Sequence, residues 1–160
     1  MKVVIDTNIL INASADESSY AFRIIKEVIE GRLEAFATHQ MMGENRQMLR
    51  KLVRDREYRE ILEEFFRRLQ IVNPSRPLSA DTLPSSGEGR IVSDPEDVKL
   101  FESAKAAQAD YIISEDREVL SVGDYEGTEV ITPQDFWTKY QGEKDDGSAW
   151  QDWGKMILGQ

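Results

Sequence analysis

The sequence contains no cysteine and a single histidine, His39, among its 160 residues. Without cysteine, the chain cannot form disulfide bonds, thiolate nucleophiles or cysteine zinc sites, and this composition is compatible with a reducing compartment. One histidine cannot build a site that needs several imidazole ligands. A Ser-His-Asp triad would have to use His39, and no G-x-S-x-G turn accompanies it, so we assign His39 a structural role.

Long apolar segments and an excess of positive charge are also absent. No stretch approaches the roughly 20 apolar residues of a membrane span, and Asp6 and Asn8 interrupt the apolar start of the chain, which is unlike a signal peptide. We therefore expect a soluble, cytoplasmic protein that makes no contact with membranes. The net charge is −10, from 30 acidic and 20 basic residues. Such a charge argues against a protein that coats nucleic acid, but metal ions could supply local positive charge to an enzyme.

Apolar runs typical of strands alternate with segments of helical periodicity. We expect strands at VVI near the start, LEAFAT, YIIS and TEVIT, with QIV as a short edge strand. We expect helices after a cap at Ser18 or Ser19, from about His39, after Asp55, from Pro95 to about Gln108, through Leu120, and from Pro133. This alternation predicts an α/β fold with a mostly parallel sheet.

The length of the chain fits one domain, which we place at residues 1–141. Residues 73–90 within it are rich in proline, serine and glycine, and we expect them to form a flexible internal loop. Residues 142–160 differ in composition and form a C-terminal extension. Trp150, Trp153 and Ile157 recur there at helical spacing, so this extension could form a short amphipathic helix that packs on its own domain or on a second chain.

Two of the expected strands end at acidic residues. Asp6 follows VVI, and Glu115 and Asp116 follow YIIS. Because the carboxyl ends of parallel strands meet at one edge of a sheet, we expect Asp6 and Asp116 to face the same crevice. Asp6, Thr7 and Asn8 could equally form a simple turn after the strand, since Asp and Asn favour turns.

Further acids lie at the starts of expected helices, at Glu44, Asp94 and Asp97. Clustered carboxylates repel one another, and bound Mg²⁺ or Mn²⁺ offsets their charge because these cations prefer oxygen ligands. Paired ions of this kind can activate water and stabilise the leaving oxygen of a phosphodiester. The alternative for each acid is an ordinary place on a solvent-exposed helix.

The stretches VVIDTNIL and SDPEDVKLFESAKAAQADYIISEDREVL, together with Glu44, resemble the PIN domain family of metal-dependent ribonucleases. Within that family the sequence looks closest to a bacterial group assigned as toxin components of toxin–antitoxin pairs, and the resemblance covers residues 1–137. It implies a three-layer α/β/α sandwich with a mostly parallel central sheet. It also implies that Mg²⁺ or Mn²⁺ is held by the four acids Asp6, Glu44, Asp97 and Asp116.

By the same resemblance, Thr7, Asn8 and Asp94 are candidate helpers at the site. Glu115 and Glu118 depart from the family pattern, because many relatives carry a small or neutral residue at the first position and often aspartate at the second. Glu118 could be a ligand, a charge at a helix start, or neither.

The resemblance implies an endoribonuclease that cuts single-stranded RNA. It also implies that the protein forms a homodimer and binds an antitoxin protein. A non-catalytic RNA- or protein-binding module that keeps the fold is the alternative. A haloacid-type phosphatase is disfavoured, because it needs a second aspartate where this chain has Asn8. A basic stretch could guide RNA phosphates, bind an acidic partner, or pair with glutamates on its own helix surface; its candidate RNA contacts are Arg46, Arg50, Lys51 and Arg54.

Overall fold

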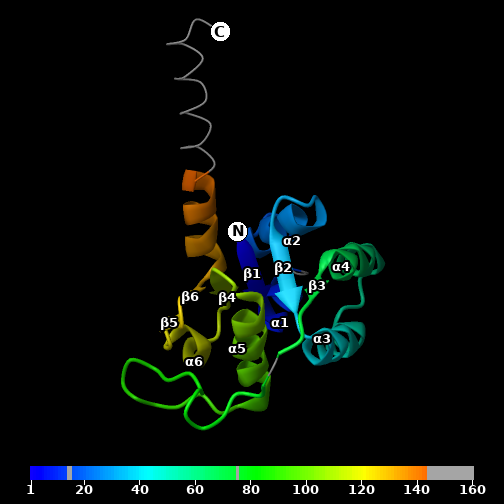
Figure 1. Cartoon of the computed structure of the whole chain (residues 1–160). Coiled ribbons are helices and arrows are strands. Elements are labelled where there is room, and N and C mark those ends of the chain that lie inside the picture. The colour runs from blue at the N-terminus through cyan, green and yellow to red at the C-terminus, as the bar shows by residue number, and fades with distance from the viewer. Residues whose placement is uncertain (14–15, 75, 144–160) are drawn as a thin grey trace, which may run out of the picture.

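A central sheet carries helices on both faces in the computed structural model, which describes residues 1–13, 16–74 and 76–143 (Figure 1). The expected single domain falls almost wholly within these ranges. Of the expected C-terminal extension, residues 142 and 143 continue a helix, whereas Trp150, Trp153 and Ile157 lie outside the described residues. No described helix is long and apolar enough to cross a membrane.

The sheet has six strands within the described residues, in the order β3-β2-β1-β4-β6-β5. All neighbouring strands pair in parallel except β5 and β6, which pair antiparallel. β1 therefore lies between β2 and β4, and the two strands that end in acids are neighbours. The strands are β1 (Lys2–Ile5), β2 (Glu34–Ala37), β3 (Gln70–Ile71), β4 (Tyr111–Ile113), β5 (Asp124–Tyr125) and β6 (Thr128–Ile131).

Helices connect these strands, and their starts follow local capping signals. Ser19 caps α2 by accepting a hydrogen bond from the backbone N–H of Phe22, and Asp55 caps α4 in the same manner. Pro95 lies in the first turn of α5. The helices are α1 (Thr7–Ala13), α2 (Tyr20–Ile29), α3 (His39–Leu52), α4 (Arg56–Arg68), α5 (Pro95–Ala107) and α6 (Arg117–Leu120), and residues 133–143 are also helical.

The pleat of the central strands divides the core into two clusters. Val3 and Ile5 of β1 pack with α1, α2, α4 and the helix of residues 133–143 on one face. Val4, which points the opposite way, packs with α5 and α6 on the other face. This arrangement is the predicted three-layer α/β/α sandwich with a mostly parallel sheet (Figure 1).

Two elements were not expected from the sequence. α1 begins at Thr7, directly after β1, where a simple turn was one interpretation and no helix was expected; its short apolar stripe, Ile9, Leu10 and Ala13, is buried under the sheet. β5 forms a hairpin with β6 through Glu126 and Gly127, and both residues have positive φ. This backbone is typical of a two-residue type I′ turn, for which asparagine or aspartate is the usual first residue.

Candidate active site

The four acids expected at the site, Asp6, Glu44, Asp97 and Asp116, line one pocket at the carboxyl edge of the sheet. Its volume is about 250 Å³, and we call it the carboxylate pocket. The candidate helpers line it as well: Thr7, Asn8, Asp94 and Glu118. The remaining lining residues are Met41, Asn45, Met48, Glu96, Lys99 and Leu100. Glu115 does not line the pocket and instead accepts a hydrogen bond from Asn12 Nδ2 at 2.6 Å.

Ser114 joins the ends of the two acidic strands. Its hydroxyl donates to Asp6 Oδ2 at 2.8 Å and accepts from the backbone N–H of Asp116 at 3.0 Å. Ser114 is completely buried, and Asp6 is only 8% exposed. We did not single out Ser114 from the sequence, although a serine that ends an apolar strand directly before two acids is a usable signal. The hydroxyl therefore fixes where the Asp6 carboxylate lies relative to the start of α6.

Burial raises the pKa of Asp6 above its usual range, and the nearby charge of Asp116 raises it further. Hydrogen bonds from Ser114 and from the backbone N–H of Asn8 act in the opposite direction because they stabilise the carboxylate. A buried carboxylate held in this way is a costly arrangement for a protein to keep without a compensating role.

Asp97 lies in the first turn of α5, with several other carboxylates around it. Burial raises its pKa to about 6, and the charges of Asp116, Asp94, Asp6 and Glu118 contribute in that order. Charges from three segments of the chain, at Asp6, at Asp94 and at Asp116 with Glu118, therefore act on one carboxyl group.

Asp116 and Asp94 also have a structural duty. Asp116 caps α6, since its Oδ1 accepts from the backbone N–H groups of Glu118 and Val119. Asp94 caps α5 through the N–H of Glu96 at 2.9 Å. One oxygen of each carboxylate is thus engaged in a helix cap, and the helper role of Asp94 stays a prediction.

Two contacts tie α3 to the pocket. Glu44 forms an ion pair with Lys99 of α5, whose side chain is 15% exposed. Thr7 donates its hydroxyl hydrogen to Asn45 Oδ1, and this amide is buried. Neither Lys99 nor Asn45 was expected from the sequence, because lysine and asparagine on helices are ordinary surface residues.

The donor chemistry of the pocket suits a hard divalent cation, since carboxylate oxygens are its preferred ligands and the crowding around Asp97 calls for positive charge. In the described part of the chain, however, no three acidic or histidine residues converge closely enough to hold a metal ion. Glu44 is paired with Lys99, and the two caps each occupy an oxygen. The residues fit the cation in kind, and their side chains would have to turn toward it.

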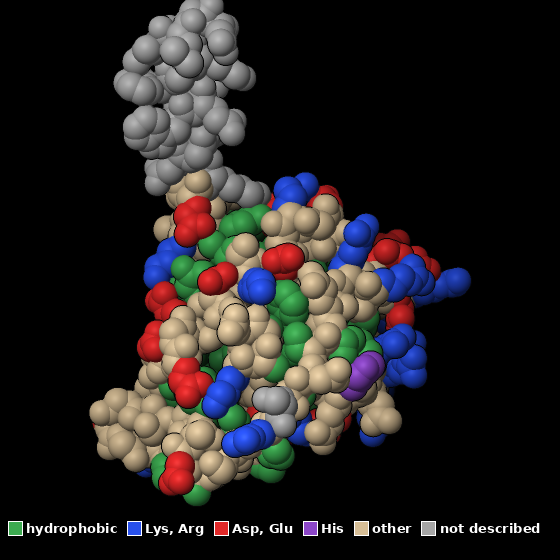
Figure 2. Space-filling view, viewed as in Figure 1, with side chains coloured by type: hydrophobic (Ala, Val, Ile, Leu, Met, Phe, Trp, Pro, Cys, Tyr) green, Lys and Arg blue, Asp and Glu red, His purple; other side chains and the backbone are tan. Residues whose placement is uncertain are grey.

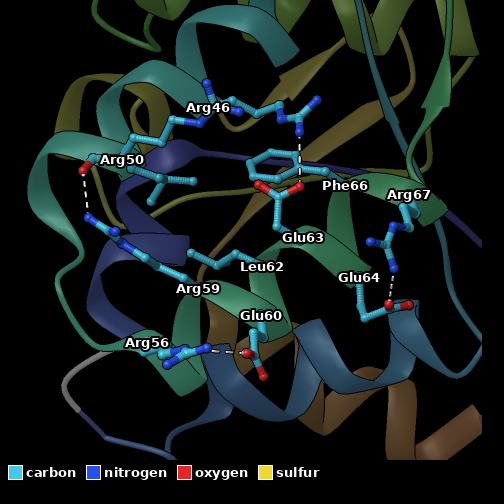
Figure 3. A pocket seen from close by; sticks show the side chains of 11 residues that line it. Arg46, Arg50, Arg56, Arg59, Glu60, Leu62, Glu63, Glu64, Phe66 and Arg67 are labelled. Carbon is cyan, nitrogen blue, oxygen red and sulfur yellow. Dashed lines mark hydrogen bonds and ion pairs between the residues drawn. The ribbon is translucent and has the colours of Figure 1, made fainter.

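The arginines predicted to contact RNA do not line this pocket. Arg46 and Arg50 line a separate groove of about 810 Å³ between α3 and α4 (Figure 3). Arg46 pairs with Glu63 at 2.9 Å and lies over the ring of Phe66, and its buried Nε has no hydrogen-bond partner among the described residues. Lys51 and Arg54 line neither hollow. RNA contact by these four residues stays a prediction.

This edge of the molecule mixes both signs of charge. Lys and Arg side chains gather beside Asp and Glu over α3 and α4 (Figure 2). Three further arginines share the groove with Arg46 and Arg50, namely Arg56, Arg59 and Arg67, and the acids there are Glu60, Glu63 and Glu64. Two of these arginines pair with acids, Arg56 with Glu60 and Arg67 with Glu64.

The fold and the acid-lined pocket define a recognised class. A family model described as PIN domain matches residues 2–118, and the chain belongs to the PIN domain family. This confirms the family that VVIDTNIL and SDPEDVKLF indicated.

A solved structure of VapBC2 from Rickettsia felis, bound to a DNA fragment from their promoter, is similar in fold. It is 14% identical with a TM-score of 0.53, over 81% of this chain and 97% of that one. PAE2754 from Pyrobaculum aerophilum is 15% identical with a TM-score of 0.48, over 81% of this chain and 92% of that one. At these identities the likeness shows the fold alone. No curated protein matches the chain.

Proposed function

We propose that this protein is a metal-dependent endoribonuclease that hydrolyses phosphodiester bonds of single-stranded RNA. The observation that carries this proposal is the crowding of carboxylates around Asp97 in a pocket at the carboxyl edge of a PIN sheet. Membership of the PIN domain family supports the same chemistry.

Asp6, Glu44, Asp97 and Asp116 would hold Mg²⁺ or Mn²⁺. When bound, the ion would supply the Lewis acidity that activates water and offsets phosphate charge. The protein's own contribution is positioning: Ser114 holds the Asp6 carboxylate, and the Thr7–Asn45 contact holds α1 against α3. Lys99 pairs with Glu44 and balances its charge.

The proposal extends to partners. The structure of VapBC2, similar in fold, was determined with DNA from the promoter, and together with the family resemblance it supports a toxin role with an antitoxin protein as partner. We also propose a homodimer. Light scattering that gives the mass of one chain at high micromolar concentration would contradict the dimer, and a genomic neighbour that encodes no small DNA-binding protein would weaken the toxin assignment.

A non-catalytic RNA- or protein-binding module is the second candidate. It is favoured by the absence of three converging acids in the described residues and by the pairing of Glu44 with Lys99. Cleavage of a labelled single-stranded RNA separates the two functions. We expect cleavage with Mn²⁺ or Mg²⁺, none in excess EDTA, and none by Asp97→Asn. Undiminished cleavage in EDTA would refute the metal mechanism, and RNA binding without any cleavage would favour the module.

A further inference from the structure

A second groove, of about 840 Å³, lies beside the carboxylate pocket. The chain between β3 and α5 forms one side, and α6 forms the other. Arg90 and Ile91 line it from the first side, and Arg117 and Ser121 line it from the second. We call it the Arg90–Arg117 groove. In Figure 1 the chain between β3 and α5 is the long green loop that extends below α5 and α6.

The groove and the carboxylate pocket share a wall. Asp94 and Glu118 line both hollows. A chain-like ligand with one phosphate at the four acids would therefore continue into the groove without leaving the surface.

Backbone hydrogen bonds hold the loop side of the groove in place. Ser85 and Ile91 form an antiparallel bridge, the N–H of Ser86 donates to Arg90 O at 2.8 Å, and the N–H of Val92 donates to Pro84 O at 2.8 Å. The loop is also tied to α6, because the N–H of Gly87 donates to Ser121 O at 3.2 Å. These bonds present Arg90 and Ile91 from a fixed turn, although the flexibility expected for residues 73–90 is not tested by them.

The hydroxyl of Tyr125 adds an anchor from the sheet by donating to Thr82 O at 2.6 Å. β5, which carries Tyr125, thus supports the loop as well as ending the sheet. A site built on tethered backbone loses less entropy when a ligand binds than a free loop would.

The side chains of the groove suit a nucleic acid strand. Neither Arg90 nor Arg117 forms an ion pair with any described residue, and guanidinium groups match phosphate oxygens in charge and geometry. Ile91 is 56% exposed, which is unusual for a large apolar side chain and offers a surface on which a base can pack. Glu88 is the one acid of the groove that does not also line the carboxylate pocket.

The groove between α3 and α4 offers less to a phosphate. Arg46 is paired with Glu63, and Arg59 donates to the backbone oxygens of Val53 and Arg50. That groove also shares no lining residue with the carboxylate pocket. Of the arginines that line these two grooves, only Arg90 and Arg117 therefore belong to a groove that shares lining residues with the carboxylate pocket.

We propose that the Arg90–Arg117 groove binds the nucleotides next to the scissile phosphate of a single-stranded RNA. Arg90 and Arg117 contact backbone phosphates, and Ile91 packs against a base. This inference rests on the proposed ribonuclease function, and it identifies where the substrate strand runs.

The test compares two double variants that each remove two positive charges. Arg90→Gln/Arg117→Gln changes the groove, and Arg56→Gln/Arg68→Gln changes exposed positions on α4 as the matched control. Both are made in an Asp116→Asn background, so that a labelled RNA oligonucleotide stays intact with Mn²⁺ present. Fluorescence anisotropy gives the affinity over a range of salt concentrations, and melting curves confirm that each variant is folded.

We expect the groove variant to bind RNA at least tenfold more weakly at low salt. The slope of log affinity against log salt should fall by about 1.4, since each phosphate contact to a single strand contributes roughly 0.7. The control should keep its slope. Ile91→Gln should weaken binding without changing the slope, because it removes an apolar contact and no charge. In the otherwise wild-type enzyme, Arg117→Gln should raise KM more than it lowers kcat.

Equal losses in the groove variant and the control would overturn the proposal, because they would reflect long-range charge alone. If the wild type cleaves RNA and the groove variant keeps its slope, the groove assignment fails and the ribonuclease function stands. If the groove variant shows the expected change in slope but the wild type never cleaves RNA, the groove assignment stands and the ribonuclease function fails. An absence of both binding and cleavage would remove both.

Discussion

At the scale of single residues, the site depends on how each carboxylate is held. The hydroxyl of Ser114 donates a hydrogen bond to Asp6 and accepts one from the backbone N–H of Asp116, and Ser114 is completely buried. Burial and four nearby carboxylates raise the pKa of Asp97. These two residues allow positioning and electrostatics to be tested separately.

Replacing Ser114 with alanine should impair both stability and cleavage. The change leaves a buried Asp6 oxygen and the Asp116 N–H without their partner, a loss of about 1–3 kcal/mol in the free energy of unfolding. Thr128→Val is the matched control, because the Thr128 hydroxyl donates to Ala109 O at 2.7 Å in a buried place away from the pocket. Denaturant unfolding and RNA cleavage should show both variants destabilised and only Ser114→Ala slowed. Full activity in Ser114→Ala would contradict its positioning role.

The raised pKa of Asp97 makes the metal-free protein less stable as pH rises. The folded state holds a proton on Asp97 up to about pH 6, whereas the unfolded chain releases it near the ordinary value of 3.8. The contribution of Asp97 is therefore fully present below pH 3.8 and lost as pH rises through 6. Solvent screening should keep it below about 1 kcal/mol. In EDTA, the denaturant midpoint of the wild type should fall relative to that of Asp97→Asn between pH 4.5 and 7; parallel curves would exclude the effect.

At the scale of elements, the carboxylate pocket lies between α3 and α5, two helices that are far apart in the sequence. α3 follows β2 and carries Glu44, and α5 precedes β4 and carries Lys99. Their ion pair connects the helices and keeps Glu44 from the other acids. α3 also lines two different hollows. Glu44 and Asn45 line the carboxylate pocket, and Arg46 and Arg50 line the groove between α3 and α4.

Removing the lysine should tighten the binding of the divalent cation. In Lys99→Gln, Glu44 loses its competing partner and the pocket loses a positive charge, so both effects favour Mn²⁺. An ion pair of up to about 1 kcal/mol corresponds to a roughly two- to fivefold gain in affinity. Calorimetric titration with Mn²⁺ measures it, with Lys105→Gln as the control, because Lys105 of the same helix pairs with Glu126 outside the pocket. Unchanged or weaker binding would show that Lys99 does not compete for the site.

At the scale of the whole molecule, the sheet order assembles the pocket. β1 pairs with β4, so residues as far apart in the sequence as Val3 and Tyr111 become neighbours. A cation bound between such distant segments stabilises the folded state as a whole, because the unfolded chain holds no comparable group of ligands.

Mn²⁺ should therefore raise the melting temperature of the wild type, with about 2.7 kcal/mol of stabilisation at a concentration 100-fold above the dissociation constant. Asp116→Asn should shrink this shift, while leaving the metal-free protein as stable as the wild type or up to about 1 kcal/mol more stable, since asparagine also caps helices and like-charge repulsion falls. Asp55→Asn, at the cap of α4 and outside the pocket, is the control and should keep the full shift. A full Mn²⁺ shift in Asp116→Asn would argue against its role as a ligand.

Much of the fold could be predicted from local signals. Apolar strands that end in acids, caps such as Ser19 and Asp55, and Pro95 at a helix start are short-range features, and the described elements begin where these signals occur. α1 and the β5 hairpin escaped prediction because they are short and lack strong signals. α1 follows β1 without a break, and the hairpin turn uses glutamate before Gly127.

The sequence by itself determined the family, the order of most strands and helices, and the acids that reach the carboxyl edge of the sheet, because backbone conformation and strand ends depend on near neighbours in the chain. Only the tertiary structure decided which groups meet there. The contacts of Ser114 with Asp6 and of Lys99 with Glu44 join elements far apart in sequence, and the contact of Arg46 with Glu63 joins two packed helices. Such pairings follow from how helices pack on the sheet, and a pattern read along one chain carries no record of that packing.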